Sequence, residues 1–151
     1  MALVNVNELL QHATAHHYGV AAVNVINVET VKYIIEAAES ERVPVIVQFY
    51  PGFDSYIDME YIAHAAVDMA RRASVPVAVH LDHSAGYEIA MKGLKSGFPS
   101  VMVDGSSLPF EENIELTASI VRAAEVFGVD VEAELGHVGS GANEDDIVNT
   151  D

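Results

Sequence analysis

The stretch Pro76-Val-Ala-Val-His-Leu-Asp-His-Ser84 decides how the rest of this chain is interpreted. Residues 76–81 form a short apolar run, which predicts a buried strand, and the run ends abruptly in Asp82 and His83. A buried strand has no structural use for a carboxylate and an imidazole side by side at its carboxyl end. Because an α/β barrel keeps its chemistry at that end of its strands, the stretch predicts a site there.

Apolar, β-rich runs alternate with helical patterns on both sides of this stretch. The expected strands cover residues 20–25, 44–49, 76–81, 100–103 and 129–135. The expected helices cover residues 3–17, 29–41, 58–73, 85–95 and a longer segment that ends at Gly128. This alternation is typical of a parallel sheet covered by helices, which makes the fold class α/β. A complete (β/α)8 TIM barrel takes about 250 residues, so this chain is expected to supply about the first five strands.

The composition excludes several classes of partner. The 151 residues include 23 acidic and only 7 basic side chains, for a formal net charge of −16, so nucleic acids and anionic membrane surfaces are repelled. No apolar run of about 18 residues and no signal sequence is present, so no membrane association is expected. The chain has no cysteine, which fits the cytoplasm and leaves His, Asp and Glu as the metal ligands.

Polar residues stand at or near the carboxyl end of each expected strand. In a parallel barrel these positions surround one rim, so residues that are far apart in sequence would converge on one pocket. The alternative is that they cap helices and turns, which applies best to Asp104 because Gly105 and two serines follow it. The residues concerned are Asn24, Gln48, Asp82 with His83, Asp104 and Glu134.

Three blocks along the chain resemble one known family. The blocks are His80-Leu-Asp-His83, Val101-Met-Val-Asp-Gly-Ser106 and Glu132-Ala-Glu-Leu-Gly-His-Val-Gly139. They resemble the successive signature blocks of the class II, zinc-dependent fructose- and tagatose-bisphosphate aldolases. Two opening segments, Ala22-Val-Asn-Val25 and Pro44-Val-Ile-Val-Gln48, are similar to the start of that family. Residues 1–151 therefore resemble the amino-terminal part of a single TIM-barrel aldolase domain.

The resemblance implies roles for individual residues. Asp82 would be the catalytic acid/base that exchanges a proton with the C4 hydroxyl as the C3–C4 bond breaks or forms. His83 would be a ligand of the catalytic zinc, and Asp104 and Glu134 would be carboxylates in the same metal neighbourhood. Glu144 matches the loop glutamate that moves the proton at C3, although residues 139–143 are about two residues longer than the usual stretch.

The family also implies the reaction and its partners. Asn24 and Gln48 would bind substrate, and a monovalent cation would accompany Zn²⁺. The activity would be reversible cleavage of fructose- or tagatose-1,6-bisphosphate to dihydroxyacetone phosphate and glyceraldehyde 3-phosphate. That activity belongs to glycolysis and carbohydrate metabolism, and the expected assembly is a homo-oligomer, a dimer or a tetramer.

Elementary chemistry favours a metal route for this cleavage. The electrons left on C3 must be held as an enediolate, either by a divalent metal or by a lysine Schiff base. The lysines are Lys32, Lys92 and Lys95, and all three fall in helical patterns rather than at strand ends. His80, inside the strand, is interpreted as a core residue, and the helical histidines His12, His16, His17 and His64 as solvated.

Two features argue against aldolase activity of residues 1–151 alone. Only His83 stands where the family binds zinc by histidine, whereas a catalytic zinc normally takes three protein ligands. The strand ends supply no Arg or Lys to hold the phosphates. Tyr50 also replaces the small hydroxyl residue that the family commonly places near a phosphate.

Two other functions stay open at this stage. A non-catalytic, aldolase-like subunit would keep the strand pattern but lose the acid/base, so the presence of Asp82 and His83 argues against it. Another metal-dependent barrel enzyme, such as a hydrolase, would use His80 and His83 together. That pair is geometrically poor, because residues 80 and 83 lie on opposite sides of an unbroken strand.

Overall fold

The structure is a computed structural model and describes residues 2–136. Its five strands form one sheet in chain order, and each neighbouring pair is parallel. This confirms the α/β class and the expected parallel order. The strands are β1 (Ala21–Asn24), β2 (Val45–Phe49), β3 (Val77–Ser84), β4 (Ser100–Val103) and β5 (Asp130–Ala133).

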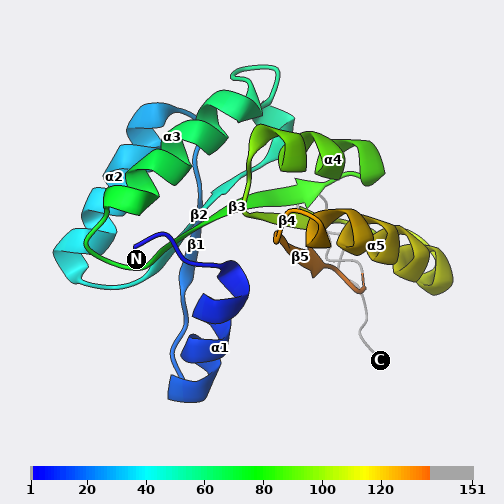
Figure 1. The fold of residues 1–151 in the computed structure, drawn as a ribbon, viewed down its shortest axis with the longest axis horizontal. Helices are drawn as coiled ribbons and strands as arrows, with labels where there is room; N and C mark the ends of the chain where they lie inside the picture. Colours follow the sequence, from blue (N-terminus) through cyan, green and yellow to red (C-terminus); the bar gives the residue numbers. More distant parts are fainter. Residues whose placement is uncertain (1, 137–151) are drawn as a thin grey trace, which may run out of the picture.

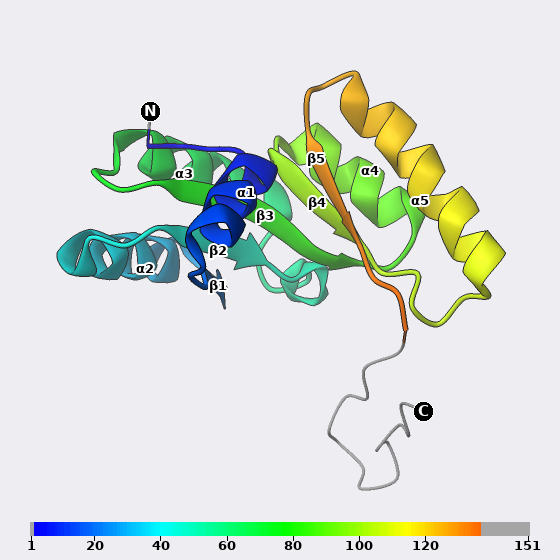
Figure 2. The same cartoon turned by 90° about the horizontal axis from the view of Figure 1, so that it is seen from below.

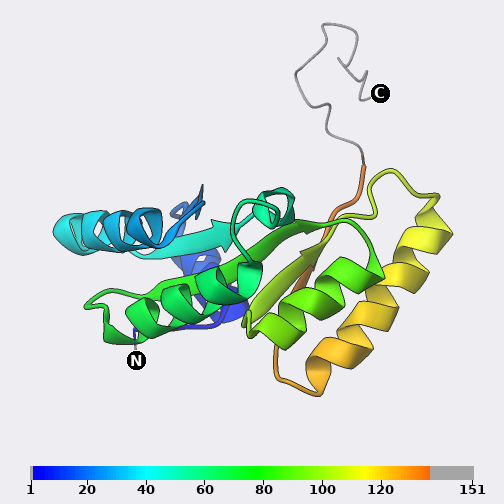
Figure 3. The same ribbon diagram turned by 90° about the horizontal axis from the view of Figure 1, so that it is seen from above.

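Helices cover both faces of this sheet unequally. The helices are α1 (Val6–His16), α2 (Val28–Glu41), α3 (Met59–Arg72), α4 (Tyr87–Ser96) and α5 (Phe110–Glu125), with a 3₁₀ turn, η1 (Pro51–Phe53), after β2. Helices α2 to α5 follow one another along the outer face, as Figure 3 shows. Helix α1 lies on the opposite side of the sheet from them (Figure 1).

Side-chain alternation along the strands gives each face its own core. On the outer face, Val47, Phe49, Val79 and Leu81 are fully buried against the helices, together with residues such as Ile62 of α3. Full burial of one such side chain stabilises the fold by roughly 2 kcal/mol. This outer core therefore anchors the strands and fixes which side chains point to the inner face.

The inner face has a smaller apolar cluster at the amino-terminal half of the strands. Val6 and Leu9 of α1 pack there against Ile46 of β2 and Ala78 of β3. Because α1 covers this half, the polar side chains further along the same strands are left to face a cavity at the other end. The inner face of the sheet therefore has an apolar half under α1 and a polar half at the carboxyl ends of the strands.

Local signals account for several helix ends. Asn27 and Thr30 form a capping box at the start of α2, with the Thr30 amide donating to Asn27 Oδ1 over 2.8 Å. Gly97 ends α4 with a φ of 91°, as expected for a helix stop. Helix α5 ends at Glu125, and Gly128 follows with a φ of 65°.

Three segments differ from the sequence-based expectation. Residues 3–5 are extended rather than helical, because Leu3 bridges Val77 in parallel and the Val4 amide donates to the Val77 carbonyl over 3.0 Å. The turn η1 was not expected. Strand β3 continues to Ser84, three residues beyond the expected end.

The sheet is open at β5, which lies beside α5 at one edge of the molecule (Figure 2). A largely apolar groove of about 460 Å³ runs along this edge, lined in part by Phe110, Ile114 and Leu135. Such an apolar edge is expected of an open half barrel. No helix within residues 2–136 is long and apolar enough to cross a membrane.

Candidate metal centre and acid/base site

The polar ends of β2 to β5 converge on one cavity, as their positions predicted, whereas Asn24 at the end of β1 contacts Asp82 and is not one of the lining residues. The cavity has a volume of about 870 Å³ and lies at the carboxyl ends of β2 to β5. Its polar lining includes Gln48, Asp82, His83, Asp104, Glu132 and Glu134. Four segments separated by up to 86 positions in the chain are therefore brought to one site by the parallel topology.

A β-bulge lets two consecutive side chains of β3 face this cavity. Leu81 pairs with Val101 and Ser84 pairs with Val103, so β3 advances three residues where β4 advances two. His83 has a φ of 40°, in the left-handed region that a non-glycine residue rarely adopts. The expected strand ended before Asp82, but both residues lie inside β3, and the irregularity in its register brings their side chains to the same cavity.

Asp82 is buried and is held by two amides from neighbouring strands. Its Oδ2 accepts hydrogen bonds from Gln48 Nε2 over 2.9 Å and from Asn24 Nδ2 over 3.2 Å. Asn24 and Gln48 are register partners in β1 and β2, so their side chains lie on the same side of the sheet. The other oxygen, Oδ1, lies 3.9 Å from His83 Nε2. One carboxylate oxygen is thus fixed by the sheet while the other faces the histidine.

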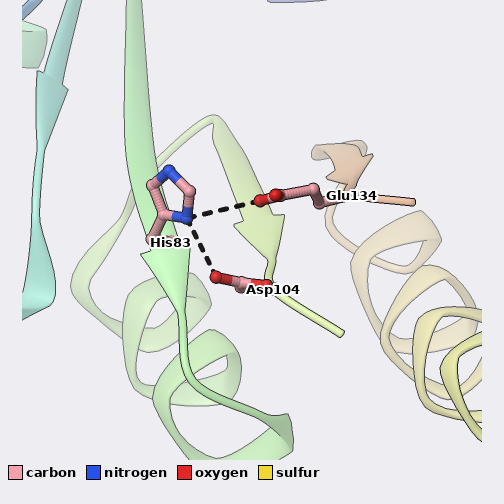
Figure 4. Close-up of side chains that lie close together, drawn as sticks. All are labelled: His83, Asp104 and Glu134. Carbon is pink, nitrogen blue, oxygen red and sulfur yellow. Dashed lines mark hydrogen bonds and ion pairs between the residues drawn. The ribbon is translucent and has the colours of Figure 1, made fainter. Parts of the chain in front are cut away.

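His83, Asp104 and Glu134 form a cluster whose ligand atoms all lie within 4.8 Å of one another. His83 Nδ1 lies 3.1 Å from Asp104 Oδ2 and 3.6 Å from Glu134 Oε2, and Figure 4 shows that this one nitrogen faces both carboxylates. Imidazole nitrogen and carboxylate oxygen are ligands that Zn²⁺ accepts. The three residues therefore have the chemistry and proximity to hold a divalent metal.

Hydrogen bonds from neighbouring residues position both acidic residues of this cluster, Asp104 through its carboxylate and Glu134 through its backbone. Asp104 Oδ1 accepts from the Ser106 hydroxyl over 2.6 Å and from the Ser106 amide over 3.1 Å. Asp104 thus forms the turn with Ser106 that the sequence allowed, while its other oxygen, Oδ2, faces His83. The backbone oxygen of Glu134 accepts from the buried Asn113 Nδ2 over 2.8 Å. The sequence did not identify Asn113 as a supporting residue, because nothing distinguishes it from other polar residues of a helix.

The charges around His83 control its protonation. Partial burial alone would lower its pKa, but the hydrogen bond with Asp104 and the negative charges of Asp82, Asp104 and Glu134 together raise it above the ordinary value. The hydrogen bond from the Ser106 hydroxyl outweighs burial and, with His83, lowers the pKa of Asp104. In the absence of a metal, a proton on His83 is therefore the cation that this cluster favours.

A second histidine–carboxylate pair, His80 and Glu132, belongs to the same site. His80 is buried, as expected, and its Nδ1 pairs with Ser100 Oγ over 2.8 Å. Within residues 2–136 its Nε2 has no hydrogen-bond partner and lies 3.4 Å from Glu132 Oε2, so only one ring nitrogen of the expected core histidine is hydrogen-bonded there. Burial is the main reason that the pKa of His80 is lowered to about 4. Burial, then the charge of Asp82, raises the pKa of Glu132.

Glu132 opens the third block that resembles the family, but its position in the sequence did not predict a role for it. The signal was present, because residues 132 and 134 alternate with Ala133 along the final strand and so share one side. Among the other expected residues, Glu144 lies outside the described residues. Lys32, Lys92 and Lys95 do lie in helices, and Lys92 pairs with Asp54 over 2.6 Å.

The fold and the site together define a class: a parallel α/β protein with a candidate metal centre at the carboxyl ends of its strands. The family model for class II fructose-bisphosphate aldolase matches residues 4–151. A fructose-bisphosphate aldolase of Thermus caldophilus is 45% identical over 136 residues, which cover 90% of this chain and 44% of that protein. A fructose-bisphosphate aldolase of Helicobacter pylori is 42% identical over 137 residues, covering 90% and 45% respectively.

Solved structures agree with these sequence relatives. The YdjI aldolase of Escherichia coli K12 superposes with a TM-score of 0.84 at 39% identity, covering 91% of this chain and 54% of that one. The chain belongs to the class II fructose-bisphosphate aldolase family and carries five strands of its TIM barrel. It spans about half the length of the relatives that it matches.

Proposed function

We propose that this chain is the β1 to β5 part of a zinc-dependent class II ketose-bisphosphate aldolase. The reaction is reversible cleavage of fructose- or tagatose-1,6-bisphosphate to dihydroxyacetone phosphate and glyceraldehyde 3-phosphate. The observation that carries the proposal is the arrangement of two functions in one cavity: Asp82 held by Asn24 and Gln48, beside the cluster of His83, Asp104 and Glu134. Family membership supports it, since the named relatives are fructose-bisphosphate aldolases.

The donor set fits a divalent metal. Asp82, Asp104 and Glu134 place three carboxylates around one imidazole, and this negative charge needs a cation for balance. His83, Asp104 and Glu134 would hold the ion, with Zn²⁺ as the proposed metal and a monovalent cation as an accompanying one. When bound, the metal supplies a Lewis acid that polarises the ketose carbonyl.

Asp82 is the proposed acid/base for the C4 hydroxyl. Two amide donors occupy Oδ2, so Oδ1 is the oxygen left to take up or return the proton. In this proposal Asn24 and Gln48 contact substrate at the rim and also keep the Asp82 carboxylate in one orientation. Glu144 is proposed to move the proton at C3.

The remaining functional assignments follow from the proposed reaction. Its substrates are phosphorylated ketoses and trioses, its place is in glycolysis and carbohydrate metabolism, and its compartment is the cytoplasm. The cysteine-free composition supports that compartment. The expected assembly is a homo-oligomer, a dimer or a tetramer, with no nucleic-acid or membrane partner.

A hydrolase that binds metal through His80 and His83 is less well supported. His80 is buried with Nδ1 on Ser100, while His83 turns its own Nδ1 to the two carboxylates. A non-catalytic subunit would have no need to orient Asp82 with two amides. The geometry of Asp82 and of the cluster therefore favours the aldolase.

Joining residues 1–136 to the matching remainder of the Thermus caldophilus relative provides the test. Zinc-dependent release of glyceraldehyde 3-phosphate is measured with fructose- and tagatose-1,6-bisphosphate in turn, with and without a chelator. Turnover of either substrate that the chelator abolishes is the expected result. Turnover that survives chelation, or its complete absence in a folded, zinc-loaded hybrid, would contradict the proposal.

A further inference from the structure

The start of helix α1 is capped by a side chain from β5, the strand at the edge of the sheet. The Asn7 amide donates to Asp130 Oδ2 over 2.9 Å, although the two residues are 123 positions apart in the chain. Asn5 occupies the N-cap position of α1, but its side chain makes no capping hydrogen bond. Because the first amides of a helix have no partner within the helix, Asp130 does what an N-cap side chain usually does. Its negative charge also suits the positive end of the helix dipole.

Through this cap, α1 connects two strands that are not neighbours in the sheet. Leu9 of α1 belongs to the inner-face cluster that includes Ala78 of β3, and the segment before α1 pairs with Val77 of the same strand. The first turn of α1 also lies beside β5, whose first residue is Asp130 (Figure 2). Strand β4 separates β3 from β5 in the sheet. Helix α1 is therefore a second connection between β3 and β5, on the inner face.

The same two strands carry the candidate metal centre. His83 belongs to β3 and Glu134 directly follows β5, and His83 Nδ1 lies 3.6 Å from Glu134 Oε2. Side chains alternate along a strand, so Asp130 and Glu134 extend to the same side of the sheet. None of the residues of β5 is buried, so packing holds this strand weakly and its hydrogen bonds contribute more to its order.

We propose that Asp130 is a positioning residue for this metal centre and acts through β5 on Glu134. The inference rests on the metal centre of the proposed function, and not on the aldol reaction. The bond to Asn7 holds the start of β5 against α1, which limits the positions that Glu134 can take relative to His83. Without that bond, an ion has to order β5 as well as its own ligands, and the loss of conformational entropy weakens binding.

Zinc titrations of the 151-residue chain and of three variants test this inference. Asp130→Ala should weaken zinc binding about tenfold, the change that corresponds to loss of one N-cap hydrogen bond. Asp130→Asn keeps an oxygen that accepts from the Asn7 amide, so its affinity should stay within about twofold of the parent, because Asn caps helices as well as Asp does. Asn5→Ala is the matched control at the same helix end. Its side chain makes no capping bond, so zinc affinity and thermal stability should both be unchanged.

Hydrogen exchange at the Asn7 amide gives a readout that a merely structural role of Asp130 would not change. Coupling between the cap and the metal centre is reciprocal, so zinc should slow this exchange in the parent chain and leave it unchanged in His83→Ala. Zinc affinity of Asp130→Ala within about twofold of the parent, or exchange at Asn7 that zinc does not slow, would overturn the inference and leave the metal centre standing. A parent chain that binds no zinc would contradict the metal centre itself, and the inference with it.

Discussion

At the scale of single residues, the cavity depends on how Asp82 and His83 share the end of β3. The bulge between Leu81 and Ser84 presents both side chains to one cavity, and the left-handed backbone of His83 is part of that geometry. Sequence reasoning identified both residues from the polar end of an apolar run. It could not identify the bulge, because strand periodicity alone places neighbouring side chains on opposite faces.

The raised pKa of His83 predicts how metal binding depends on pH. A metal binds the neutral imidazole, and in the metal-free state His83 keeps its proton to a higher pH than an ordinary histidine. Zinc affinity should therefore rise by roughly tenfold per pH unit up to the raised pKa and level off above it. Calorimetric zinc titration of the chain at several pH values measures this. Equal affinities at about pH 6 and about pH 8 would contradict the assigned role of His83.

The buried His80 predicts a loss of stability on acidification. Its pKa is about 4 in the folded state, whereas an unfolded chain restores the ordinary value of about 6.5, so the unfolded state binds more protons between these values. The free energy of unfolding should be highest above about pH 6.5 and fall by up to about 3 kcal/mol towards pH 4. Denaturant titrations of the chain and of His80→Phe check this. The slope should shrink in His80→Phe and persist in His64→Gln, an exposed histidine of α3.

At the scale of elements, most of the fold followed from the sequence and part of the site did not. Apolar runs located all five strands to within a few residues, and polar strand ends located the rim. The sequence did not reveal that Leu3 and Val4 pair with β3, because their apolar character is equally compatible with a helix. It also assigned no role to Asn113, whose importance arises only when α5 packs beside β5.

The link between α5 and Glu134 yields a prediction at this scale. Asn113→Ala removes the amide that donates to the Glu134 carbonyl and leaves Glu134 less firmly placed. Zinc affinity at the cluster should fall by roughly 10–100-fold, as expected for loss of a residue that supports a metal ligand. Zinc titration of the folded variant measures the effect. Ser119→Ala on the same helix, where the hydroxyl bonds only to Leu116, is the control and should bind zinc normally.

At the scale of the whole molecule, the described cavity lacks part of what the reaction needs. None of the residues that line it within residues 2–136 is a lysine or an arginine, although the substrate carries two phosphates. A catalytic zinc also normally takes three well-placed protein ligands, and this cluster offers a single histidine. The 151-residue chain assayed alone with zinc and either bisphosphate should show no turnover, and zinc-dependent turnover by the purified chain would refute this prediction.

The most direct test of the central claim separates turnover from metal content in the hybrid aldolase described above. The account predicts that Asp82→Ala keeps its zinc and loses at least about 10²–10⁴-fold in turnover, because only the acid/base is removed. His83→Ala should lose zinc from this site as well as turnover, and Asp68→Ala, on the exposed surface of α3, should change neither. Near-normal turnover of zinc-loaded Asp82→Ala would contradict the assignment of the acid/base and with it the proposed function.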